Sequence, residues 1–205
     1  FAGLGFGAIN VVMNVSISNL FSHKRASTLN LLNVFFGLGA IIAPAVAGLS
    51  LRLASSALPA IRLGAGLELA LLPFFFWLFL SPAPSADHAS TQRNNRNLLQ
   101  SPALWLLGIL LLLYVGSENG AGGWVSTYMQ QTTSLAATSA ALAASGFWLA
   151  YTAGRMAAAW LGTRWSVRLL LTTSLGIAFM GGTVIFASTG NAAISILGFL
   201  LLGFG

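Results

Sequence analysis

Residues 102–128 form the stretch that decides the fold, beginning PALWLLGILLLLYVG and continuing SENGAGGWVSTY. A membrane-crossing helix needs about 20 largely apolar residues, and this stretch exceeds that with Glu118 as its one charged side chain. Comparable runs occupy roughly residues 1–21, 28–50, 61–81, 138–161 and 168–187, and a seventh begins near residue 192. Because backbone groups in lipid must be bonded within their own segment, and the runs do not alternate as barrel strands do, each run predicts a helix. The sequence therefore predicts an all-α membrane protein with about seven transmembrane helices.

Composition supports the same class. Apolar residues make up 57% of the chain and charged residues 6%, whereas soluble domains carry roughly a quarter charged residues. The mean hydropathy is +0.85, so lipid must solvate most of the surface, and the bilayer is the first expected partner. The net charge of +6 comes from basic residues scattered near the ends of apolar runs, which is typical of topology signals and not of nucleic-acid binding. The chain has no cysteine, and we expect no metal and no cofactor.

The basic residues predict the orientation of the helices. Lys and Arg gather in alternate connections, at residues 22–27, 82–101 and 162–168, and such connections face the cytoplasm. Arg52 and Arg62 depart from the pattern in one of the other connections. We therefore expect the first residue to face the outside.

Residues 82–101 differ from every other connection because they are long, polar and rich in Pro and Asn. This composition is typical of a linker. We predict that residues 1–81 belong to an N-terminal helical bundle, that 82–101 form a cytoplasmic linker, and that 102–205 belong to a C-terminal bundle. The chain has no initiator Met and starts and ends inside apolar runs, so we expect a piece of a longer protein.

Several motifs resemble the major facilitator superfamily. They are GLGFG at 3–7, LFSHKR at 20–25, LNLLNVFFGLGA at 29–40 and YVGSE at 114–118. The resemblance covers essentially the whole chain, from the family's fourth helix to the start of its tenth, and is strongest to the fucose permease-like branch. It implies a secondary transporter of a small solute by alternating access, with a sugar as solute, a proton as coupling ion, and the bacterial inner membrane as location.

The sequence also departs from that branch. Asn10 stands where the branch often has an acidic residue, and Asn33 stands where it often has His, so two expected proton carriers are missing. The small residues around Pro44 resemble a motif of drug/proton antiporters. A drug or metabolite exporter of the same fold is therefore a second hypothesis.

Glu118 is the sharpest candidate for function, because a carboxylate in the middle of a membrane helix usually faces a cavity. We predict that it couples transport to protons, against the alternative of a structural carboxylate bonded to a neighbouring helix. Its neighbour Asn119, and the aromatic residues Trp124 and Tyr128 one helical turn apart, are predicted to bind the substrate. The alternative for the aromatic pair is the interfacial belt.

Asparagines mark two further candidate substrate contacts. Asn10 and Asn14 are four residues apart and so share one helix face, and Asn30 and Asn33 form a smaller patch on the next helix. In lipid such side chains must face protein or water, and the alternative to substrate binding is hydrogen bonding between helices.

Basic residues near the predicted cytoplasmic ends, Arg155, Arg164 and Arg168, are predicted to act as a gate or loop anchors. A seven-helix receptor is an alternative of another class, but the last run has no Lys for a retinal Schiff base. An enzyme is not expected, because no His lies in the apolar runs and no Ser–His or His–Asp pairing is available there.

Overall fold

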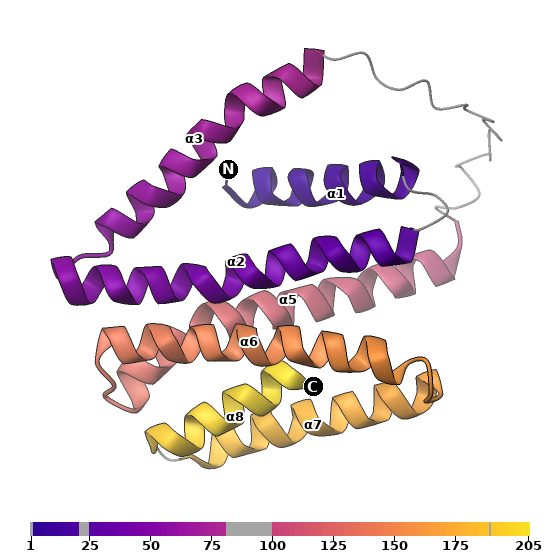
Figure 1. Ribbon diagram of the computed structural model, residues 1–205. Coiled ribbons are helices and arrows are strands. Elements are labelled where there is room, and N and C mark those ends of the chain that lie inside the picture. Colours follow the sequence, from indigo (N-terminus) through magenta and orange to yellow (C-terminus); the bar gives the residue numbers. More distant parts are fainter. Residues whose placement is uncertain (1, 21–24, 81–99, 189) are drawn as a thin grey trace.

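The computed structural model describes residues 2–20, 25–80, 100–188 and 190–205, which fold into seven α-helices with no strand in those ranges (Figure 1). The helices are α1 (Ala2–Leu20), α2 (Arg25–Ala54), α3 (Leu58–Leu80), α5 (Pro102–Thr132), α6 (Ala137–Leu161), α7 (Val167–Ala187) and α8 (Ala192–Phe204). This confirms the all-α prediction, and each helix falls on one of the seven apolar runs. Most of the predicted linker, residues 82–99, lies outside the described residues.

Local signals set several of these boundaries. Ser166 precedes α7, and its side chain accepts a hydrogen bond from the backbone nitrogen of Leu169. Asn191 precedes α8 and accepts from two backbone nitrogens in the same way. Such caps satisfy amide groups that a helix start leaves without an internal partner. Pro102 stands in the first turn of α5, where its missing N–H costs nothing.

The outer surface of the helices is apolar. Three helices in the described part of the chain are long and apolar enough to cross a membrane, namely the segment Leu31–Ala54 of α2, then α5, then α7. Phe186 and Phe179 on α7 are 91% and 79% exposed. A soluble protein rarely exposes such a continuous apolar surface, and lipid is the solvent that stabilises it. The chain is therefore an integral membrane protein.

Helix α6 lies at the centre of the packing. It packs against α2, α5 and α8, with α2 and α8 on opposite sides of it, while α7 packs on α8, and α1 and α3 contact α2 (Figure 1). The buried apolar core forms where α5, α6 and α8 meet, from Val125, Met129, Ala140, Ala144, Phe147 and Phe199. The contact between α2 and α6 joins the two predicted bundles. The division into bundles stays a prediction.

Glycines allow the C-terminal helices to approach at backbone distance. A Cβ atom added to Gly181 on α7 would meet the backbone nitrogen of Leu202 and would lie 2.8 Å from the carbonyl oxygen of Gly198, both on α8. A Cβ on Gly154 of α6 would collide with the backbone of Phe204. Small residues at helix contacts are what permits close packing in membranes, so these glycines fix the spacing of α6, α7 and α8.

We therefore expect Gly181→Ala to destabilise the protein and Gly176→Ala, on the same helix, to leave it unchanged or slightly more stable. The first forces α7 and α8 apart at a cost of about 1–3 kcal/mol. The second has open space around its Cβ and gains up to about 1 kcal/mol of helix propensity. The check is the unfolding temperature of both variants in detergent. Equal shifts for the two positions would contradict the close contact.

Candidate functional site

The site is an open cavity of about 720 Å³ lined by α5, α6, α7 and α8. Most of its wall is apolar, contributed by leucine, alanine and phenylalanine side chains. Its polar lining consists of Tyr114, Ser117, Glu118, Tyr151, Arg155 and Ser174. Few polar groups on an apolar wall are typical of sites for small molecules.

An ion pair lies on the wall of this cavity. The Oε2 atom of Glu118 on α5 lies 3.6 Å from Nη2 of Arg155 on α6, and the two side chains are 9% and 36% exposed. A charged group in a membrane helix is expensive unless it is paired or meets water, and here each charge has the other as its partner. The pair is longer than the roughly 2.7–2.9 Å of a tight charge-assisted hydrogen bond, so the contact is electrostatic and loosely held.

Two tyrosines complete the polar cluster. The hydroxyl groups of Tyr114 and Tyr151 share a hydrogen bond of 3.0 Å, and Nη2 of Arg155 donates to Tyr114 at 3.2 Å. The Arg155 guanidinium also lies over the Tyr151 ring, with Cζ 4.4 Å from the ring centroid. Tyr114 stands four residues before Glu118, and Tyr151 stands four before Arg155, so each helix presents a tyrosine one turn from its charge. Our sequence predictions did not include the tyrosines as site residues, although this matched spacing was visible.

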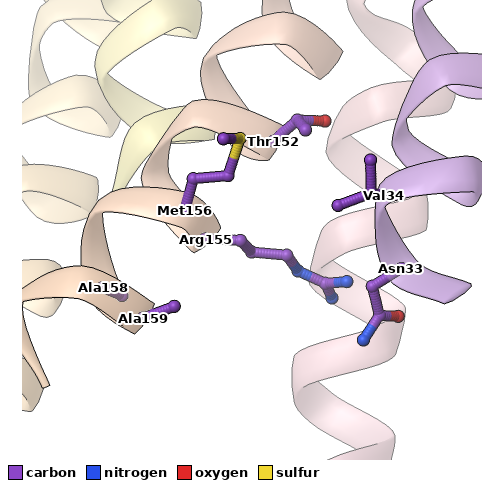
Figure 2. Close-up of a pocket in the computed structure, with 7 residues that line it drawn as sticks. All are labelled: Asn33, Val34, Thr152, Arg155, Met156, Ala158 and Ala159. Atoms are coloured by element: carbon purple, nitrogen blue, oxygen red, sulfur yellow. The ribbon is translucent and has the colours of Figure 1, made fainter. Parts of the chain in front are cut away.

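A second pocket, of about 490 Å³, opens between α2 and α6. Figure 2 shows the Arg155 side chain extending from α6 toward Asn33 on α2, with Val34 and Thr152 beside it. Arg155 lines both this pocket and the larger cavity. Arg155 thus shares one pocket with Asn33 and the other with Glu118, two residues that the sequence singled out separately.

The other candidates on α5 lie elsewhere. Trp124 is 68% exposed and lines neither pocket. The Asn119 side chain donates a hydrogen bond to the carbonyl oxygen of Val115 in its own helix, at 2.9 Å. Tyr128 packs edge-on against Phe199, and its hydroxyl lies 3.3 Å from the buried Ser188 hydroxyl. In this structure Tyr128 therefore joins α5 to α7 and α8, and the substrate contacts predicted for these residues remain predictions.

The asparagines of α1 lie apart from the ion pair. The Asn14 side chain donates a hydrogen bond to the carbonyl oxygen of Asn10 at 2.8 Å, and both residues are exposed. The side chain of Asn30 lies outside the described residues. Of the three predicted asparagines whose side chains the structure describes, Asn33 alone lines one of the two pockets.

Arg164 and Arg168 lie at the ends of α6 and α7, away from the cavity. Arg164 is exposed and its guanidinium lies over the Trp160 ring, 4.6 Å from the centroid. Arg168 is exposed in the first turn of α7. Both positions fit loop anchors, whereas Arg155 lines both pockets and has a carboxylate partner that the sequence did not reveal. The gate or anchor roles stay predictions.

The side chains of the cluster set the chemistry that it can perform. Among the described residues no group of three His, Cys, Asp or Glu side chains could hold a metal ion. What the cluster offers is one carboxylate, one guanidinium and two phenol hydroxyls around a space large enough for a small solute.

A family model described as Major Facilitator Superfamily matches residues 1–205, the whole chain. The protein named Bypass of stop codon protein 6, from Saccharomyces cerevisiae, is 36% identical over 59 residues. That match covers 29% of this chain and 12% of the yeast protein. No solved structure matches the chain.

Proposed function

The chain belongs to the Major Facilitator Superfamily, and from that premise we propose that the protein is a secondary active transporter that moves a small solute across a membrane by alternating access. The observation that carries the proposal is the Glu118–Arg155 pair on the wall of the cavity that α5, α6, α7 and α8 line. A lipid-exposed surface explains the rest of the composition but not two charges placed inside the bundle. Charged groups at membrane depth mark substrate and ion paths.

Glu118 is the proposed proton carrier. Its side chain is almost buried and lines the cavity. The Arg155 guanidinium lies 3.6 Å from it, a distance at which the carboxylate can exchange Arg155 for a proton. A proton arriving at this carboxylate would neutralise it and free Arg155. That event changes the charge of the cavity wall, which is the kind of local change that biases a two-state element.

Three finer points of the proposal rest on the sequence motifs. The resemblance to the fucose permease-like branch favours a sugar-like solute and a bacterial inner membrane. We also propose that the chain corresponds to the stretch from the family's fourth helix to the start of its tenth. In that arrangement α1 to α3 belong to one bundle and α5 to α8 to the other, and the packing of α2 on α6 lies between them.

The transport cycle can be tested without knowing the solute, by introducing single cysteines into the full-length protein free of other cysteines. We expect Ser174→Cys, in the cavity wall, to react with a membrane-impermeant thiol reagent added from either side, because alternating access opens the cavity to each side in turn. The liposome membrane itself should remain impermeable to the reagent. Met180→Cys, on the same helix but outside the cavity lining, is the matched control and should stay unreactive. Reaction of Ser174→Cys from one side alone would contradict the proposal.

A further inference from the structure

The contacts of Arg155 with Glu118, Tyr114 and Tyr151 do not explain the whole of its position. Its guanidinium reaches the wall of the pocket between α2 and α6, where Asn33 and Thr152 supply polar groups (Figure 2). Resting on the transport function proposed above, we propose that the solute is a small organic monocarboxylate bound by Arg155 and carried together with one proton on Glu118, so that each cycle transfers no net charge.

The guanidinium has donors to spare for such a solute. It carries five N–H groups in a planar fork, and its contacts with Glu118 and Tyr114 both use the Nη2 atom. Within the described part of the chain, Nη1 and Nε have no hydrogen-bond partner. A carboxylate matches this fork with two parallel hydrogen bonds, whereas a neutral hydroxyl group uses it poorly.

Charge balance requires that a proton accompanies the solute carboxylate. With Glu118 ionised, the pair with Arg155 is neutral, and a second carboxylate would place two negative charges on one positive charge in a low-dielectric site, which is unfavourable. When a proton from water binds the Glu118 carboxylate, Arg155 can pair with the solute and the site is neutral again. The single positive charge of Arg155 balances only one carboxylate at a time, so the solute carboxylate and the proton travel together.

Among the polar groups that face one another in the cavity, Glu118 is the proposed proton site. Tyr114 faces it from its own helix, and Tyr151 and Arg155 face it from α6. The residues of α7 and α8 that line the cavity are apolar apart from Ser174. Of these side chains, only the Glu118 carboxylate changes from charged to neutral when it binds a proton.

The pocket also limits the size and charge of the anion. Beyond Arg155 its lining consists of Asn33 and Thr152, which can meet hydroxyl groups, and of small or flexible apolar side chains, namely Val34, Met156, Ala158 and Ala159. No second cation lines either pocket among the described residues. A phosphate ester or a dicarboxylate would carry an unpaired charge here, whereas a monocarboxylate with a hydroxylated chain, such as a sugar acid, would not.

The test uses the full-length protein and two pairs of probes that differ only in the acid group: D-gluconate against D-glucitol, and L-lactate against propane-1,2-diol. We expect the acids, and not the polyols, to raise the unfolding temperature in detergent. In proteoliposomes an acid-outside pH gradient should drive uptake of the acids, and a potassium diffusion potential alone should not. Arg155→Leu should weaken acid binding by about a hundredfold, whereas Arg52→Leu, an exposed arginine at the end of α2, should leave it unchanged.

Binding of the polyols as well as the acids, or of neither, would overturn the monocarboxylate proposal, and so would acid uptake driven by membrane potential. Reaction of Ser174→Cys from both sides does not depend on the solute. If that reaction occurs while the acids fail to bind, transport stands and the solute class is wrong. If Ser174→Cys reacts from one side alone, the transport proposal itself fails.

Discussion

Replacing Glu118 with Gln should abolish solute accumulation driven by a proton gradient while leaving solute exchange across the membrane intact. Gln keeps the shape and the hydrogen-bonding capacity of the side chain but cannot bind or release a proton at physiological pH. For a carrier that moves one proton with each solute, a gradient of one pH unit supports about tenfold accumulation. The variant should reach no accumulation at all. The measurement is uptake in proteoliposomes, with and without an acid-outside gradient, compared with counterflow exchange at equal pH.

Glu68→Gln is the matched control for this experiment. Glu68 on α3 is the other acidic residue among the described helices, and it is exposed and lines neither pocket. It should keep full gradient-driven accumulation. Normal accumulation by Glu118→Gln would remove this carboxylate from the coupling mechanism. It would direct attention to the asparagines of α1 and α2 and to coupling by an ion other than the proton.

The helices could be predicted from the sequence because one physical requirement, hydrogen bonding of the backbone within its own segment, decides where they form. Lipid leaves the backbone no partner outside its own segment, so an apolar run of sufficient length becomes a helix whatever its neighbours do. The expected runs and the observed helices agree closely, and the largest differences, of four residues each, are at residues 51–54, which extend α2, and at residues 129–132, which extend α5 beyond its predicted end. The extension of α5 is explained by Met129, which is fully buried where α5 meets α6 and α8.

The members of the site were only partly predictable. Glu118 was found because a carboxylate is rare and costly in an apolar helix, a property of one residue in one segment. Its partner Arg155 depends on the rotation and register of α5 against α6, and packing between helices sets both. The same rotation turns Trp124 outward and leaves Asn119 bonded to its own helix. Spacing along one helix cannot show which face meets a neighbour when lipid and protein are both apolar.

Replacing Arg155 with Met should destabilise the protein strongly, and adding Glu118→Gln to that variant should recover most of the loss. Removal of one partner leaves the other as an uncompensated charge, at a cost of about 3–5 kcal/mol for buried pairs. Since Arg155 is 36% exposed whereas Glu118 is 9% exposed, we expect about 3 kcal/mol for Arg155→Met. Unfolding temperatures of the two single variants and the double variant, in detergent at fixed pH, complete the cycle that isolates the coupling between the two side chains.

Two further variants separate the ion pair from the other contacts of Arg155. Tyr114→Phe removes the hydroxyl that accepts from Arg155 and should cost about 1 kcal/mol. Arg164→Met removes an exposed arginine that lies over an aromatic ring and should change stability by less than about 1 kcal/mol. If Arg155→Met costs no more than Arg164→Met, the Glu118 carboxylate is not held by Arg155. The same conclusion would follow if the stability losses of the two single variants simply added up in the double variant. A large coupling free energy between Glu118 and Arg155, together with normal folding of the double variant, would instead show that stability does not require the two charges. That result is expected for an ion pair that must open during transport.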